Sequence, residues 1–170
     1  MNRSLKYALH FLLILATQLL LFEHLDLGLY LYPMPYLIFL LLFPCTYPTA
    51  GLMLWAFAFG FFLDVLGGPT LGLHTSACVT LAALRNGLIK TVTVKGDLDS
   101  LTVPGFVQFG ALRYSFFVLL CVAIHHTAYF MLEAFSFLFF WHTLARLTCS
   151  VLLNTLLILL FQRTLFEQRR

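Results

Sequence analysis

Polar and ionisable residues interrupt the apolar runs of this sequence, and they are the residues that could do chemistry. They are Asp64, His74, His126, Glu133, His142, Arg146, Ser150 and Asn154. An ionised side chain at the centre of a bilayer costs about 2.5 to 3.5 kcal/mol on insertion scales, so such residues face the protein interior and have partners. Two uses are open. The first is interhelical hydrogen bonding that fixes packing, at less than about 2 kcal/mol per bond; the second is a pathway for protons or a solute.

Spacing predicts which of these residues share a face. Four of them recur at every fourth position: His142, Arg146, Ser150 and Asn154. On a helix this spacing forms a continuous polar ridge that cannot face lipid. His126 and Glu133 are seven residues apart and share a face of another helix, whereas His125 points about 100° away. The residues predicted to form a polar group in the outer half of the membrane are Asp64, His74, His126, Glu133, His142 and Arg146.

An ion pair is predicted for Arg146. This residue lies roughly two turns into its expected span, which is about 10 Å deep at 1.5 Å per residue. Its long side chain can extend toward the membrane surface. Asp64 and Glu133 lie at the outer ends of their own expected spans. We hypothesise that Arg146 pairs with Asp64 or with Glu133.

The sequence lacks the spacings of familiar metal, nucleotide and redox sites. No two histidines have the i, i+4 spacing of metal ligands on one helix. The motifs G-x-x-x-x-G-K-[ST], G-x-G-x-x-G and H-E-x-x-H do not occur. The four cysteines are spread one per span, which excludes C-x-x-C, and are interpreted as packing residues. We therefore predict no catalytic residue, no metal and no cofactor.

Length and composition set the context for these residues. The chain has 170 residues, of which 61% are hydrophobic and 10% charged, with a mean hydropathy of +0.94. A soluble domain is about half apolar and about a quarter charged. Each bilayer crossing takes about 20 residues, so six crossings leave no room for a separate soluble domain. We predict an all-α integral membrane protein with one transmembrane domain over residues 1–170.

Six apolar runs predict six transmembrane helices joined by short loops. The expected spans are about 5–22, 29–47, 49–66, 70–89, 112–132 and 139–161, with a cytoplasmic connection over 90–111. Pro33 and Pro35 fall in the opening turn of the second span, where a missing N–H has no intrahelical partner anyway. Gly67, Gly68 and Pro69 are a strong helix breaker before the fourth span. Ala56 and Gly60 form a small-xxx-small pair, which fits a close helix crossing within the chain or to a partner.

The Lys and Arg residues set the expected orientation, because cytoplasmic loops carry most of them. With six spans and a cytoplasmic N-terminus, every one of the ten except Arg146 falls on the inner side. The inner residues are Arg3, Lys6, Arg85, Lys90, Lys95, Arg113, Arg163, Arg169 and Arg170. We expect both termini in the cytoplasm. The net charge of +3 is then anchor charge that favours anionic lipid headgroups rather than nucleic acid.

The segment from Gly60 to His74, GFFLDVLGGPTLGLH, resembles the signature of the MreD family of bacterial rod shape-determining membrane proteins. In that family a G-x-x-x-D motif ends the third span and leads through a turn of small residues and proline into a Gly-x-His start of the next. Here the matching residues are Gly60, Asp64, Gly72 and His74, with Gly67, Gly68 and Pro69 in the turn. The stretch from His125 to Phe137 also resembles the corresponding stretch in one branch of the family. The length of the chain and the polar ridge that begins at Arg146 are similar to the family as well.

This resemblance implies a non-enzymatic component of the elongation machinery for peptidoglycan in the bacterial inner membrane. Its expected partner is the membrane protein MreC, and through MreC the transpeptidase and glycosyltransferase of side-wall synthesis and the MreB filament. Asp64 would then shape a docking cleft by capping the next helix, because a carboxylate near a helix N-terminus gains about 0.3 to 1 kcal/mol.

A second function stays open, because the family is similar in fold to the substrate-binding S components of energy-coupling-factor vitamin transporters. The chain would then be a small-molecule uptake subunit with a closed, partly polar cavity and a bound ligand. The short outer loops favour the scaffold, since a ligand lid usually requires a longer connection.

Overall fold

The computed structural model describes residues 3–25, 27–67, 70–93, 103–134 and 140–166, and every regular element in this part of the chain is helical. Its helices are α1 (Arg3–Thr17), η1 (Gln18–Phe22), η2 (Pro35–Leu37), α2 (Ile38–Leu41), α3 (Thr49–Leu66), α4 (Leu73–Val92), α5 (Phe106–Phe109), α6 (Ala111–Ala134), α7 (Phe140–Phe161) and η3 (Gln162–Phe166). The all-α prediction is confirmed for these residues.

Four of the described helices are long and apolar enough to cross a membrane. They cover Leu5–Phe22, Thr49–Leu66, Ala111–Ala134 and Phe140–Thr164. Their bounds lie within a few residues of the first, third, fifth and sixth expected spans. Helix α4 is 20 residues long and matches the fourth expected span in place, but it carries Arg85, Asn86 and Lys90 in its second half. The protein therefore has the character of an integral membrane protein, with four helices that meet both criteria.

The second expected span is wrong as a continuous helix over residues 29–47. Residues 31–34 belong to no helix, and helical structure runs only from Pro35 through η2 to Leu41 at the end of α2. The prolines explain the difference. Pro33 and Pro35 lack an N–H, and each disfavours helical backbone in the residue before it, while Pro44 limits the far end. Three prolines in twelve residues thus leave a seven-residue helical segment.

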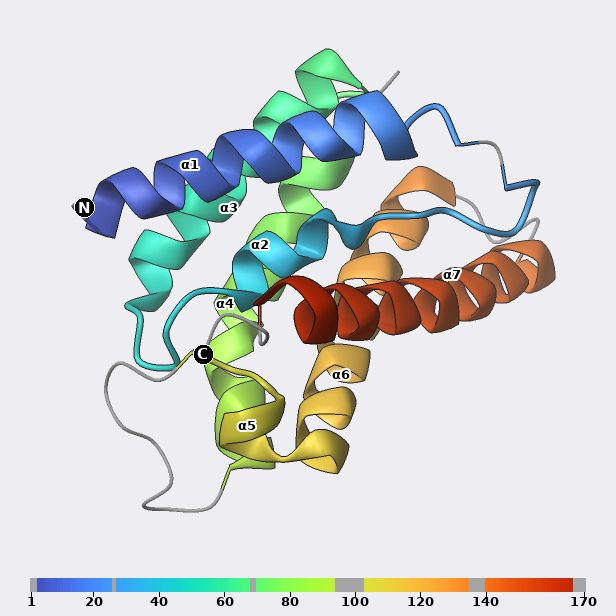
Figure 1. The fold of residues 1–170 in the computed structure, drawn as a ribbon. Helices are drawn as coiled ribbons and strands as arrows, with labels where there is room; N and C mark the ends of the chain where they lie inside the picture. The colour runs from blue at the N-terminus through green and yellow to red at the C-terminus, as the bar shows by residue number, and fades with distance from the viewer. Residues whose placement is uncertain (1–2, 26, 68–69, 94–102, 135–139, 167–170) are drawn as a thin grey trace.

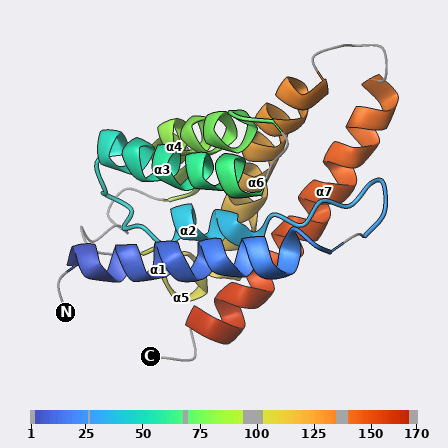
Figure 2. The ribbon, with the colours of Figure 1, turned by 90° about the horizontal axis from the view of Figure 1, so that it is seen from above.

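This short segment lies at the centre of the bundle. Helices α3 and α4 run side by side, α4 packs against α6, and α6 packs against α7 (Figure 1). Seen from above, α2 lies between α1 and the pair formed by α3 and α4 (Figure 2). All residues of η2 and α2 are buried, and those after Pro35 are at most 4% exposed. Phe39 of α2 stacks on Phe59 of α3 with ring centroids 4.8 Å apart, and Phe11 of α1 closes the same aromatic cluster.

The crossing of α3 and α4 depends on Gly60. A Cβ atom at this position would lie 2.5 Å from the Cα and 2.7 Å from the backbone nitrogen of Thr75. No real Cβ contact is that short, so only glycine allows the two backbones to approach this closely. The small-xxx-small pair of Ala56 and Gly60 therefore serves a crossing within the chain, where Ala56 is fully buried.

The expected cytoplasmic connection 90–111 is partly helical. Helix α4 continues to Val92, and the short helix α5 precedes α6. Residues 94–102, which include Lys95, lie outside the described residues.

Candidate functional site

The carboxylate of Asp64 caps the first turn of α4 from the end of α3. Its Oδ1 accepts the backbone N–H of His74 at 2.9 Å, and its Oδ2 accepts those of Gly72 and Thr75, both at 3.0 Å. The Thr75 hydroxyl also donates to Oδ2 at 2.5 Å. Asp64 is 1% exposed, so these four bonds replace water around a buried carboxylate. The expected capping role of Asp64 is confirmed.

The glycines of this turn have distinct roles. Gly72 precedes α4 with φ +96°, a left-handed conformation that favours glycine. Gly67 ends α3, and a Cβ there would come 2.9 Å from Cδ2 of Leu19 on η1. The turn therefore approaches η1 closely. Gly68 and Pro69 lie outside the described residues.

Ser150 and Asn154 hydrogen-bond the backbone of the non-helical segment that precedes η2. The Ser150 hydroxyl accepts the N–H of Tyr32 and donates to the carbonyl of Tyr30, both at 3.1 Å. Asn154 accepts the N–H of Met34 at 2.5 Å and donates to the carbonyl of Tyr32 at 2.6 Å. Unpaired backbone groups cost several kcal/mol at membrane depth. Two side chains one helical turn apart on α7 thus supply the hydrogen-bond partners that a neighbouring strand would give to this backbone.

His126 belongs to the same network. Its Nε2 lies 3.0 Å from the amide nitrogen of Asn154, and its Nδ1 lies 3.0 Å from the carbonyl oxygen of Val122. A proton on Nδ1 satisfies both contacts, with Nε2 accepting from Asn154. His126, Ser150 and Asn154 are fully buried. The ridge and the fifth-span histidine therefore meet as predicted, and their hydrogen bonds fix packing.

A second buried network centres on Tyr36 of η2. Its hydroxyl lies 2.8 Å from Nδ1 of His74 and 3.0 Å from Nε2 of His125. The Sγ atom of Cys78 is 3.8 Å from the same His125 nitrogen. Tyr36 and His125 are buried, and His74 is 7% exposed. This network links α4, η2 and α6 at the centre of the bundle.

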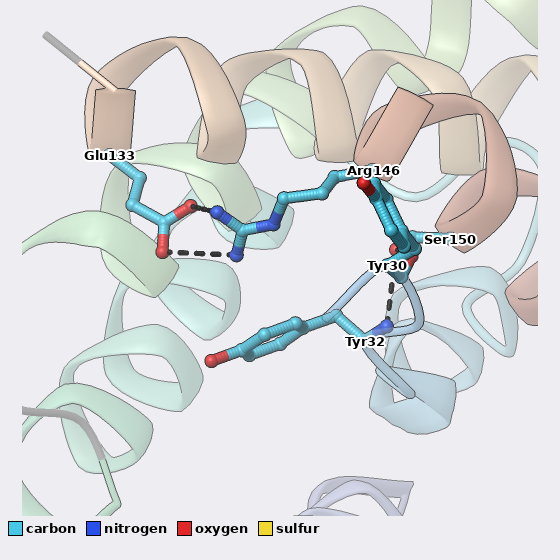
Figure 3. A network of polar contacts seen from close by, with 5 residues as sticks. All are labelled: Tyr30, Tyr32, Glu133, Arg146 and Ser150. Atoms are coloured by element: carbon cyan, nitrogen blue, oxygen red, sulfur yellow. Dashed lines mark hydrogen bonds and ion pairs between the residues drawn. The ribbon is translucent and has the colours of Figure 1, made fainter. Parts of the chain in front are cut away.

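Arg146 pairs with Glu133, which confirms one of the two predicted partners. Its Nη1 lies 3.2 Å from Oε2, and its Nη2 lies 3.4 Å from Oε1 of that carboxylate. Figure 3 shows Arg146 extended toward Glu133, with Ser150 one turn further along the same helix and Tyr32 beside the guanidinium. The guanidinium carbon is 5.4 Å from the ring centroid of Tyr32 and 5.0 Å from that of Phe130. The carboxylate of Asp64 instead accepts the N–H groups at the start of α4.

Two expectations about charged and polar positions are corrected. His142, the outermost member of the predicted ridge, is exposed, so the buried part of the ridge consists of Ser150 and Asn154. The reason is position: His142 lies in the first turn of α7, ahead of the part that contacts η2. Arg85, which is expected among the anchor charges of the inner side, is fully buried within the protein.

Arg85 binds carbonyl oxygens of the last residue of α2 and of the two residues Phe43 and Pro44 beyond it. Its guanidinium donates to Leu41 at 3.3 Å, to Phe43 and to Pro44 at 3.4 Å. These carbonyls have no helical N–H ahead of them because α2 ends at Leu41. Arg85 thus satisfies the far end of the central segment, as Ser150 and Asn154 satisfy its near end.

A cavity of about 240 Å³ opens between the end of α1, the chain that follows it and the start of α4. Its wall consists of Gln18, Phe22, Glu23, His24, Leu25, Leu27, Gly28, Leu31, Tyr32, Pro33, Met34 and His74. Burial raises the pKa of Glu23, and neighbouring His24 lowers it to a smaller extent. This wall presents polar side chains that a small molecule can reach.

Sequence reasoning missed Tyr36, His125, Arg85 and Gln18. His125 points away from the face of His126, so the spacing does not place it in the predicted cluster. A histidine in an apolar helix is nevertheless itself a signal of a buried partner. No sequence signal pairs these residues, because their partners are 38 or more positions away or are backbone carbonyls. Within the described residues, no three His, Cys, Asp or Glu side chains are grouped to hold a metal ion.

No protein-family model, curated protein or solved structure matches the chain.

Proposed function

We propose that this protein is a non-enzymatic scaffold of the bacterial inner membrane, a member of the MreD family that binds MreC and helps to maintain rod shape. Through MreC it would act with MreB and with the transpeptidase and glycosyltransferase that build the side wall. The observation that carries this proposal is the Asp64 cap. Four residues of the family-like segment, Gly60, Asp64, Gly72 and His74, form one connected unit rather than scattered matches.

The use of the buried polar groups supports a scaffold over an enzyme. The carboxylate of Asp64 accepts four hydrogen bonds, and Asn154 and Ser150 are taken up by backbone groups. A nucleophile or general base needs a side chain that is free to meet a substrate. These groups instead stabilise a fixed arrangement of helices, which suits a protein that presents a surface to partners.

The proposed topology keeps six crossings with both termini in the cytoplasm. Helix α4 would be the fourth crossing, with its charged half toward the inner side. The second crossing would be a broken one, formed by residues 29–47 around the short helical segment. Non-helical backbone is tolerated in a membrane where protein surrounds it, and here Ser150, Asn154 and Arg85 satisfy it. A similarity in fold to S components is part of this proposal.

Partner recovery tests the scaffold. Affinity purification in mild detergent, followed by mass spectrometry, should recover MreC with the wild-type protein. Asp64→Ala should lose MreC and cell shape, whereas Glu133→Gln, which changes a carboxylate at an exposed ion pair, should keep both. Unchanged MreC recovery and normal rod shape with Asp64→Ala would contradict the proposal. A reporter fused after Arg170 that is active only outside the membrane would contradict the topology.

The cavity favours one alternative, the substrate-binding subunit of an uptake transporter. The cavity is partly polar, as expected of a ligand site in that class of protein, and His74 lines it. The same purification separates the two functions. A stoichiometric vitamin or other small solute in the eluate, without MreC, would support the uptake subunit.

A further inference from the structure

The wall of the cavity carries acceptors and negative charge but no basic Lys or Arg side chain. Its one carboxylate is Glu23. Its other side chains that can accept a hydrogen bond are Gln18, Tyr32, His24 and His74. A cation with N–H donors matches this wall, whereas an anion such as phosphate would meet the Glu23 carboxylate without a compensating positive charge.

Gln18 shows that an acceptor in this wall lacks a donor. The side chain is 3% exposed, and its amide nitrogen donates to the carbonyl of Pro33 at 3.2 Å. Its Oε1 atom is buried and has no hydrogen-bond partner among the described residues. A buried acceptor without a partner costs about 1 to 3 kcal/mol. A donor brought by a ligand would remove that cost.

Glu23 lies on the same wall and is exposed, so its carboxylate can be reached from the cavity. Partial burial raises its pKa, and the described residues place no Lys or Arg in an ion pair with it. An ammonium group near this carboxylate would offset the desolvation, because an opposite charge favours the ionised form.

We propose that this cavity binds a small primary ammonium group, with Glu23 as its counter-ion, Gln18 as a hydrogen-bond acceptor and the apolar wall around its attached carbon chain. The ammonium comes either from a free amine or from the headgroup of phosphatidylethanolamine. This site is independent of the proposed scaffold role.

His74 connects the site to the interior. Its Nδ1 contacts the Tyr36 hydroxyl, so its Nε2 is the ring atom left for a ligand. When Nδ1 donates to Tyr36, Nε2 is an acceptor, and the Tyr36 hydroxyl can donate to His125. An ammonium in the cavity therefore favours one orientation of the buried hydrogen-bond chain.

Binding is tested with the full chain in nanodiscs. In discs of phosphatidylglycerol, calorimetry measures n-butylamine against n-butanol, which has similar size and no charge. In discs that contain phosphatidylethanolamine, native mass spectrometry measures retained lipid. We expect butylamine to bind and butanol not to, and Glu23→Gln to weaken amine binding about tenfold, the loss of one charge-assisted hydrogen bond.

Glu133→Gln is the matched control, because it makes the same charge change outside the cavity wall, and it should leave binding unchanged. One retained phosphatidylethanolamine that blocks butylamine identifies the headgroup as the source. Butylamine binding without retained lipid identifies a free amine. Equal binding of butylamine and butanol, or wild-type affinity in Glu23→Gln, would overturn the proposal. Recovery of MreC is a separate readout, so failure of this site and failure of the scaffold remain distinguishable.

Discussion

Asn154→Leu is the sharpest test of how the central segment is held. Leucine has the same branching and the same number of side-chain heavy atoms as asparagine, but it can neither accept the Met34 N–H nor donate to the Tyr32 carbonyl. The Met34 N–H is buried, and the Tyr32 carbonyl is partly buried. The variant therefore removes the partner of one backbone donor and one backbone acceptor, and it also removes the donor to Nε2 of His126.

The expected loss of stability is about 2 to 4 kcal/mol. Each unsatisfied buried polar group costs about 1 to 3 kcal/mol, which gives about 2 to 6 kcal/mol for two groups. Interhelical hydrogen bonds measured in membranes average about 0.6 kcal/mol, so the lower half of that range is expected. The free energy of unfolding, measured in lipid micelles with a denaturant series, gives this value.

Hydrogen exchange adds a readout specific to the segment. Pro33 and Pro35 have no N–H, so Tyr32 and Met34 supply the only amides between positions 32 and 35. Asn154→Leu should speed exchange at Met34 more than at Tyr32, because Ser150 still accepts the Tyr32 N–H.

Thr155→Val on the same helix is the matched control. The Thr155 hydroxyl is buried without a partner among the described residues, so its removal should not destabilise the protein. If Asn154→Leu stays within about 0.5 kcal/mol of the wild type, as an ordinary surface substitution does, and Met34 remains protected, the reasoning is refuted.

Three further predictions concern other parts of the bundle. Asp64→Asn keeps the side-chain volume but turns one acceptor into a donor that faces N–H groups, so thermal unfolding should show a loss of about 2 to 4 kcal/mol; an unchanged midpoint would contradict the capping role. Gly60→Ala should lower the free energy of unfolding by about 1 to 3 kcal/mol through overpacking. Gly87→Ala is its control: no neighbouring atom lies within 4 Å of the added Cβ, so this variant should gain about 0.5 to 1 kcal/mol. Equal effects of the two substitutions would contradict the close crossing of α3 and α4. Because burial raises the pKa of Glu23, the folded state binds that proton more tightly, and the free energy of unfolding should fall as pH rises from the ordinary value of 4.5 through the raised pKa. Glu23→Gln should flatten this pH dependence, and an unaltered curve would exclude Glu23 as its source.

Sequence patterns predicted features that depend on local spacing. The apolar runs predicted α1, α3, α6 and α7 within a few residues, because length and hydropathy are properties of the run itself. The glycines and the acid at the end of α3 predicted the capped turn, since Asp64 and the N–H groups it accepts are at most 11 residues apart. The prediction that Arg146 pairs with Asp64 or Glu133 also followed from the depth of each residue in its span, and the structure decided for Glu133.

Tertiary structure decided which groups the polar side chains serve. A helix over 29–47 was expected because the run is apolar, yet its prolines break it, and the freed backbone is stabilised by Ser150 and Asn154 about 120 positions later. Arg85 reads as an anchor charge on its own helix and becomes a buried donor only because α2 ends beside it.

The sequence by itself thus determined a helical membrane protein and the turn at Asp64, because hydropathy and local spacing act over a few helical turns. The folded bundle alone decided that the polar ridge of α7 holds a broken segment, and that a cavity with unmet acceptors lies beside His74. Those outcomes depend on which distant backbone groups lack partners, and a buried polar group takes whichever partner the packed helices bring within hydrogen-bond distance.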